Sequence, residues 1–199
     1  AGYHTALIGK FGIESRGVGD IVSIEDAAAT VPAMFDHLDH YEHWSEHGYE
    51  IPQPNGDIRH LTDLTGDKAI AYLQSCREPF CLSISFKAPH KPDQPDPLFD
   101  KVYAGKTFTK PANYGREYGK HFSLQSKQGR QFERFISWGY RDKYDEVMAT
   151  YHQMVHAVDA AVGMIRAAVK EAGVEKNTVF VFTSDNGCFC GSPGCGSQV

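Results

Sequence analysis

The sequence has no apolar run long enough to cross a membrane, no low-complexity tract and no internal repeat. A spanning helix needs roughly 20 mostly apolar residues, so no transmembrane helix is predicted within this chain. The formal net charge of -5 argues against a general affinity for nucleic acid or for anionic membrane surfaces. What is present is a chain of 199 residues with 41% hydrophobic content, which suits one globular domain.

The two ends of the sequence also lack ordinary features. No initiating methionine or signal peptide precedes "AGYHTALIGK", and "GCGSQV" shows neither a helix stop nor a tail. We therefore expect an internal piece of a longer protein. The missing export signal then says nothing about localisation.

The five cysteines do not form a zinc motif. They are Cys76, Cys81, Cys188, Cys190 and Cys195, and their spacing contains no pair of C-x2-C units. Unpaired loop thiols are the simplest interpretation. A disulfide or a soft-metal site among the last three stays open, and with it the redox compartment.

Three short apolar segments predict β-strands, at residues 5–8, 79–86 and 179–183. The first closes at Gly9, and the second runs into the proline-rich loop "KAPHKPDQP". The third, within "TVFVFTSDNG", is a continuous apolar run, which is typical of a strand buried in a parallel sheet.

Three segments predict helices. One is a brief helix near Ser23, and another begins at Thr65 as its N-cap. The strongest spans residues 142–172, and Gly173 is placed to end it. Its apolar stripe, which should face a sheet, consists of Tyr151, Val155, Val158, Val162, Ile165 and Val169. A long amphipathic helix followed by a buried strand predicts an α/β fold, with a predominantly parallel sheet flanked by helices.

Reactive side chains follow each predicted strand. Lys10 follows the first, His90 follows the second, and Asp185 with Asn186 follows the third. In open α/β sheets, ligands bind at the carboxyl ends of the strands. We therefore expect these four residues to converge on one pocket.

Asp185 and Asn186 offer two oxygen ligands, which suit a hard cation such as Ca2+ or Mg2+. Gly187 would allow a sharp turn of the backbone around the ion. An ordinary Asn-Gly turn is the simpler alternative. Two ligands are also too few, because Ca2+ takes about six to eight oxygens.

Three other motifs fit less well. Lys10 follows a glycine, but the spacing is not that of a phosphate-binding loop. "HQMVH" has the spacing of a zinc-protease helix, with Gln153 at the position of the glutamate base. The histidine cluster of residues 37–47 has no carboxylate or cysteine framework, so surface histidines are the simpler interpretation, although a transition-metal site stays open.

Three segments, in this order, resemble the sulfatase family of the alkaline-phosphatase-like superfamily. "GYHTALIGKFG" is similar to the family signature G-Y-x-T-x-x-x-G-K. "FKAPHKPDQPDPLFDKVYAG" is similar to the segment that carries the leaving-group histidine. The segment from "YHQMVHAVDAAVG" to "TVFVFTSDNG" resembles the helix and strand that lead into a metal-binding D-N-G. The resemblance covers most of the chain and implies the sulfatase fold.

The resemblance implies hydrolysis of sulfate esters, on small molecules or glycans. The family uses a formylglycine nucleophile, made from Cys or Ser in a C-x-P-x-R motif, and a bound Ca2+ or Mg2+. By this resemblance, Lys10 would contact the nucleophile and the sulfate, and His90 would protonate or orient the leaving alcohol. Asp185 and Asn186 would provide half of the metal shell. A periplasmic or secreted location is implied in the same way.

The sequence also departs from the family pattern. No C-x-P-x-R motif occurs in it, so we expect the nucleophile and the other metal ligands upstream of Ala1. Residues 1–199 would then be a partial catalytic domain, without its N-terminal nucleophile region and its C-terminal part, and inactive alone. Gly12, Pro193 and Gln198 stand near positions where relatives carry histidines or a lysine. Two alternatives stay open: a phosphodiesterase or phosphonate hydrolase of the same superfamily, and a non-catalytic pseudoenzyme that binds sulfated glycans.

Overall fold

The computed structural model describes residues 2–10, 34–40, 48–77 and 79–196. They form two compact units. The first comprises Ala1–Asp96 with Met154–Thr178, and the second comprises Pro97–Gln153 with Val179–Val199. The brief helix predicted near Ser23 lies outside the described residues.

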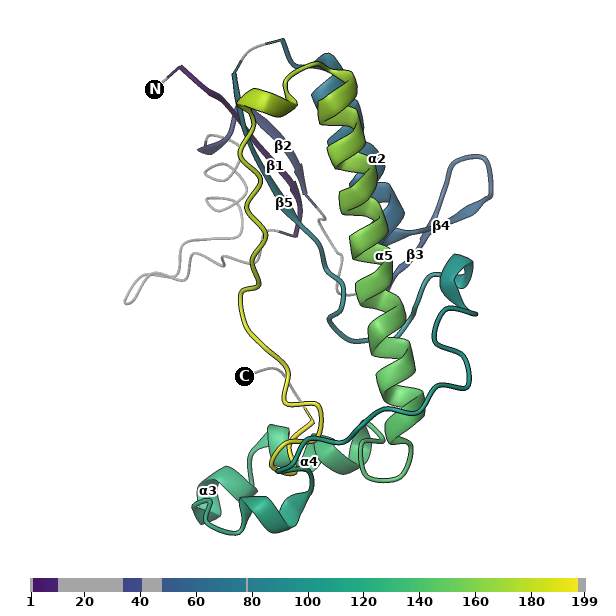
Figure 1. The fold of residues 1–199 in the computed structure, drawn as a ribbon, viewed down its shortest axis with the longest axis vertical. Coiled ribbons are helices and arrows are strands. Elements are labelled where there is room, and N and C mark those ends of the chain that lie inside the picture. The colour runs from purple at the N-terminus through teal and green to yellow at the C-terminus, as the bar shows by residue number, and fades with distance from the viewer. Residues whose placement is uncertain (1, 11–33, 41–47, 78, 197–199) are drawn as a thin grey trace. The chain divides into compact units, whose positions relative to one another are not determined.

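The first unit contains a three-stranded parallel sheet. Its strands are β1 (His4–Gly9), β2 (His37–His40) and β5 (Phe80–Ser85), in the order β2-β1-β5 (Figure 1). Both pairs are parallel, and Gly9 stands opposite Ser85 at the carboxyl ends of β1 and β5. The structure thus confirms the predicted strands at 5–8 and 79–86 and the parallel sheet.

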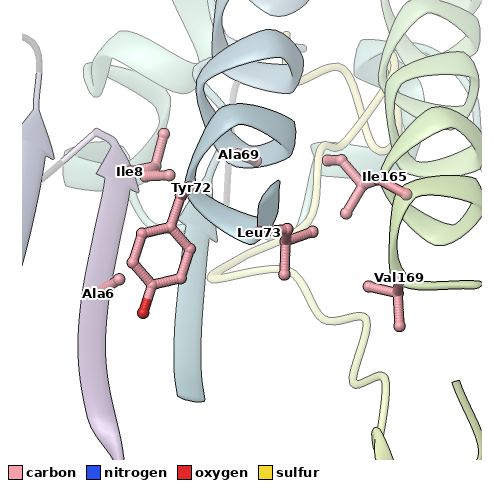
Figure 2. Close-up of a cluster of buried hydrophobic side chains, with 8 residues drawn as sticks. Ala6, Ile8, Ala69, Tyr72, Leu73, Ile165 and Val169 are labelled. Atoms are coloured by element: carbon pink, nitrogen blue, oxygen red, sulfur yellow. The ribbon is translucent and has the colours of Figure 1, made fainter. Parts of the chain in front are cut away.

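Two helices pack on this sheet. They are α2 (Leu61–Ser75) and the part of α5 (Tyr144–Glu171) that belongs to the first unit. Figure 2 shows their shared core, in which Ile8 of β1, Leu73 of α2 and Ile165 of α5 take part. Gly66 lets the helices approach, because a Cβ there would meet the Cβ of Ala161 at 3.3 Å. The apolar stripes of the helices are therefore buried against β1.

The predicted stripe of α5 is confirmed at Val158, Ile165 and Val169, which are buried. It is wrong at Val155, whose side chain is 40% exposed. Met154 is fully buried beside it. A periodic pattern sets the width of the apolar stripe, but the packing partners set its edge.

The ends of the helices follow capping chemistry. α5 ends as predicted at Gly173, where φ is 73° and the amide of Val174 donates to the carbonyl of Val169 at 3.3 Å. The predicted start of α2 at Thr65 is wrong. The N-cap is His60, whose Nδ1 accepts from the Thr62 amide at 3.3 Å, while the Thr65 hydroxyl donates to the Leu61 carbonyl inside the helix.

A short antiparallel hairpin precedes α2. It consists of β3 (Glu50–Pro52) and β4 (Ile58–His60), and neither strand is among the three predicted from the sequence. Strands of three residues carry no detectable alternation, so the sequence pattern could not reveal them. Their importance is positional, because the hairpin holds Tyr49 and His60 beside the loop after β5.

The second unit is built from short elements. They are η2 (Pro97–Phe99), η3 (Arg116–Gly119), α3 (Leu124–Lys127), α4 (Arg130–Ser137) and the first part of α5. A mainly aromatic core joins α4 to the first part of α5, and it consists of Phe135, Tyr140, Tyr144 and Met148. η4 (Glu175–Asn177) follows α5 and belongs to the first unit.

The predicted strand at residues 179–183 is wrong for this structure. Among the described residues no strand pairs with it, and Val179, Val181 and Phe182 are 87%, 82% and 78% exposed. Burial of an apolar run would contribute free energy to folding. A strand forms, however, only where a neighbouring segment pairs with its backbone hydrogen-bonding groups. No described neighbour does so here.

Asp36 joins β1 to the start of β2, and its loss should loosen β1 in a pH-dependent way. Its Oδ2 accepts from the amide and the hydroxyl of Thr5, each at 2.8 Å. These bonds, the backbone one first, lower the pKa of Asp36. Because the folded pKa is lowered, the stabilisation is present above the ordinary value of 3.8 and is lost as the pH falls through the folded pKa.

Asp36→Asn imitates the protonated carboxyl. We expect it to raise amide hydrogen exchange in the β1 peptide by roughly two- to fivefold at pH 7. The difference from the wild type should vanish at acid pH. Asp57→Asn is the control, because Asp57 pairs within its own hairpin turn, with Nδ2 of Asn55 at 2.7 Å. An equal difference at all pH values would contradict the prediction.

Candidate active site

Lys10 stands at the carboxyl end of β1, directly beside β5. Its amide donates to the Ser85 carbonyl at 2.7 Å. Gly9 before it has φ of 106°, and a Cβ there would lie 2.2 Å from the Ser85 carbonyl oxygen. Only glycine fits this close approach. The geometry of the sheet edge therefore explains the glycine before Lys10, and Lys10 itself is half-buried there.

His90 lies in the loop that follows β5, and hydrogen bonds fix both its backbone and its ring. Its amide donates to the Lys87 carbonyl at 2.9 Å. Its Nδ1 lies 2.7 Å from the Lys91 carbonyl oxygen. A carbonyl only accepts, so Nδ1 carries a proton, and Nε2 is the ring nitrogen that can exchange one.

The structure brings Lys10 and the loop of His90 to the same edge of the sheet. The two follow neighbouring parallel strands whose last residues are in register. Burial and then the positive charge of Lys10 lower the pKa of Lys87, three residues before His90. Lys10 and Lys87 are thus within electrostatic reach of each other, and two cations at one edge attract an anion.

Asp185 and Asn186 lie in the second unit, in a turn. The Asn186 amide donates to Oδ1 of Asp185 at 2.8 Å, and Nδ2 of Asn186 donates to the Gly187 carbonyl at 3.0 Å. The expectation that they end a buried strand is wrong, because residues 179–183 form none. Lys10 and His90 belong to the first unit, so the convergence of all four residues stays a prediction.

The donors of this turn fit a hard cation in chemistry but not in number. Asp185 is exposed and brings a carboxylate, and the Nδ2 bond of Asn186 leaves its Oδ1 for a ligand role. Within the described part of the chain, no group of three His, Cys, Asp or Glu could hold a metal ion. The two residues can therefore provide only part of a calcium or magnesium shell.

The cysteines are free thiols, so the disulfide left open by the sequence is not formed in this structure. In the second unit, the neighbouring Cys188 thiol and then burial raise the pKa of the Cys190 thiol. Cys190 also packs on the aromatic core. In the histidine cluster, His37 and His40 lie in β2, while His43 and His47 lie outside the described residues.

Two residues at this edge, Tyr49 and Lys87, were missed by the reasoning from sequence. Tyr49 is fully buried and Lys87 is 4% exposed, and both contact the loop of His90. Lys87 stands within the motif "FKAPHKP", so its place before His90 was a usable signal. Tyr49 is distant in sequence, and only the tertiary structure reveals it.

A comparison with protein families identifies the family of this chain. The family model described as Sulfatase matches residues 1–192. The chain belongs to the sulfatase family. This confirms the resemblance seen in the three sequence motifs.

Individual sulfatases agree with this result. The N-acetylglucosamine-6-O-sulfatase of Bacteroides thetaiotaomicron is 25% identical, over 98% of this chain and 44% of its own length. The Extracellular sulfatase SULF-1 homolog of Drosophila melanogaster is 27% identical, over 75% of this chain and 13% of its own length. The chain thus spans less than half of these relatives.

A solved structure shows the same fold. It is a protein in complex with its substrate D-glucosamine-2-N,6-O-disulfate, with 23% sequence identity and a TM-score of 0.67. The match covers 98% of this chain and 50% of that chain. The predicted fold class, a partial alkaline-phosphatase-like sulfatase fold with a parallel sheet flanked by helices, is therefore confirmed. No helix among the described residues has the length and apolar character to span a bilayer.

Proposed function

We propose that the protein, in its natural full length, hydrolyses sulfate esters. One observation carries this proposal. In a chain of the sulfatase family, Lys10 and the loop of His90 follow adjacent parallel strands in register, and the charge of Lys10 reaches that loop. A cation and a proton donor at one strand edge are what cleavage of an anionic ester requires.

Lys10 binds the sulfate and stabilises its charge in the transition state. Its backbone is fixed by the bond from its amide to Ser85, so the side chain starts from a rigid position. The ammonium is a compact point charge, and in a half-buried site its attraction for an anion is stronger than in water. Negative charge that develops on oxygen during cleavage is held by such a fixed donor.

His90 delivers the proton to the leaving alcohol. As the bond between sulfur and the alcohol oxygen breaks, Nε2 protonates that oxygen, and the Lys91 carbonyl keeps Nδ1 in place. The proton donor matters most for sugar alcohols, because an alkoxide is a poor leaving group.

Asp185 and Asn186 would hold part of the metal shell through their carboxylate and amide oxygens. When bound, Ca2+ or Mg2+ polarises the sulfate oxygens as a Lewis acid, and a formylglycine supplies the nucleophile. No C-x-P-x-R motif occurs in residues 1–199. We therefore propose that these residues are a partial catalytic domain, whose nucleophile and remaining metal ligands lie outside them.

The substrate that we propose is a sulfated sugar. One relative is named for N-acetylglucosamine 6-O-sulfate, and one structural neighbour holds a sulfated glucosamine. Such substrates derive from extracellular glycans, and another relative is named as extracellular. We therefore propose a periplasmic or secreted location.

The proposal predicts sulfate release from N-acetylglucosamine 6-O-sulfate by the natural full-length protein. Ion chromatography would measure it, with bis(4-nitrophenyl) phosphate and a phosphonate ester as competing substrates. We expect the sulfate ester to be preferred by at least about a hundredfold in kcat/KM, and residues 1–199 alone to release none. Faster turnover of the phosphodiester or the phosphonate would replace the proposal with its alternative. Sulfated-glycan binding without turnover would indicate the pseudoenzyme.

A further inference from the structure

The segment Gly48–Tyr49 holds the loop of His90 at three points. Nζ of Lys87 donates to the Gly48 carbonyl at 2.7 Å. The Tyr49 hydroxyl donates to the His90 carbonyl at 2.7 Å. The Tyr49 amide donates to Oε1 of Gln94 at 3.0 Å. One dipeptide thus contacts the beginning, the middle and the end of the loop that carries the proton donor.

The Tyr49 ring is itself fixed by its neighbours. It stacks on His60 with ring centroids 5.2 Å apart and planes at 10°, and Nζ of Lys87 lies 4.7 Å from its centroid. Nε2 of His60 in turn donates to the Gln94 carbonyl at 3.0 Å. Tyr49 is 0% exposed. Its hydroxyl therefore has little freedom to leave the His90 carbonyl.

Gly48 and the side chain of Gln94 are also closely packed. Gly48 has φ of 61°, and a Cβ there would lie 2.3 Å from Oε1 of Gln94. The segment Gly48–Tyr49 therefore fits directly against the end of the loop, and the Leu61 amide, at the start of α2, anchors it through the Tyr49 carbonyl at 2.8 Å. The segment that holds the loop is thus itself joined to the first residue of a helix.

We propose that Tyr49 is a positioning residue for His90, which acts by fixing the main chain on which the imidazole is mounted. The hydroxyl of Tyr49 holds the His90 carbonyl, while Lys87 holds the His90 amide and Lys91 holds Nδ1. Together these bonds fix Nε2 relative to the carboxyl end of β1. The inference rests on the proposed role of His90 as proton donor.

A positioning role has a consequence that a general stabilising role lacks. Proton transfer to the leaving oxygen limits the rate only when that oxygen is strongly basic. Loss of the Tyr49 hydroxyl should therefore slow alkyl sulfates and leave activated aryl sulfates almost unchanged. A displacement of about 1 Å at a catalytic group can cost roughly a hundredfold in rate.

The test uses Tyr49→Phe in the natural full-length protein and a series of sulfate esters, from 4-nitrophenyl sulfate to N-acetylglucosamine 6-O-sulfate. We expect kcat to fall by about ten- to a hundredfold for the sugar ester and by less than about twofold for the nitrophenyl ester. The plot of log kcat against the pKa of the leaving alcohol should thus become steeper.

Tyr72→Phe is the matched control. It removes a hydroxyl that also contacts a backbone carbonyl of the first unit, that of His4 at 3.4 Å, and it should leave the slope unchanged. Gln94→Leu releases the other end of the loop and should steepen the slope to a smaller degree, which covers a failure of Tyr49→Phe to fold.

His90→Ala distinguishes the positioning role of Tyr49 from the proposed role of His90 as proton donor. If it steepens the slope and Tyr49→Phe lowers all rates equally or changes none, the positioning role is overturned while the proposed function stands. If His90→Ala leaves the slope unchanged, the role of His90 as proton donor is overturned, and the inference falls with it.

Discussion

Lys10→Ala should lower kcat/KM for sulfate ester hydrolysis by about 10²- to 10³-fold in the natural full-length protein. The substitution removes a fixed positive charge from the carboxyl edge of β1, where the Lys10 amide is tied to Ser85 at 2.7 Å. The backbone bond survives the substitution, so the sheet should stay intact. Steady-state kinetics with N-acetylglucosamine 6-O-sulfate would measure the loss.

A second measurement tests the electrostatics of this edge without turnover. Burial and then the charge of Lys10 lower the pKa of Lys87, so removal of that charge should raise the Lys87 pKa part of the way toward 10.5. NMR titration of the methylated lysines would detect the change. Lys170→Ala, on the exposed side of α5, is the matched control and should alter neither quantity. Full activity of Lys10→Ala would remove Lys10 from the proposed site.

The second large effect is expected on the affinity for Ca2+. Asp185→Asn should weaken Ca2+ binding by about a hundred- to a thousandfold, because a carboxylate charge near a cation contributes on the order of 4 kcal/mol. In the wild type the Asn186 amide donates to Oδ1 of Asp185 at 2.8 Å. Asparagine at position 185 keeps an oxygen that can accept this bond, so the turn itself should persist. Isothermal titration calorimetry with the natural full-length protein would give the affinity directly.

Activity should follow the affinity. At low free Ca2+ the variant should be nearly inactive, and millimolar Ca2+ should restore part of the rate. Asp159→Asn, which changes an exposed carboxylate on α5, should bind Ca2+ like the wild type. Unchanged Ca2+ affinity in Asp185→Asn would show that the D-N-G segment is an ordinary turn.

The elements with strong local signals were predicted well. Residues 5–8 and 79–86 became β1 and β5, and residues 142–172 became α5 with Gly173 at its end. In each case several local preferences agree, namely apolar period, length and a terminating glycine or proline. The adjacency of Lys10 and the His90 loop then followed from the parallel order of the sheet.

The wrong predictions concern residues whose local sequence is compatible with more than one structure. Thr65 can cap a helix or donate back to a carbonyl within it, and the contact of His60 with Thr62 decided for the latter. Residues 179–183 have the composition of a core strand, yet their side chains lie exposed. The sequence of residues 179–183 cannot indicate whether a neighbouring strand is present to pair with them.

The sequence by itself determined the family, the strands that end at Lys10 and before His90, and the hard oxygen donors Asp185 and Asn186. These are properties of residue type and order, which local chemistry expresses directly. The tertiary structure alone decided that Gly48 and Tyr49 hold the His90 loop, and that the run before Asp185 stays unpaired among the described residues. Such contacts join residues far apart in the chain, and their free energy exists only once the fold has brought both partners together.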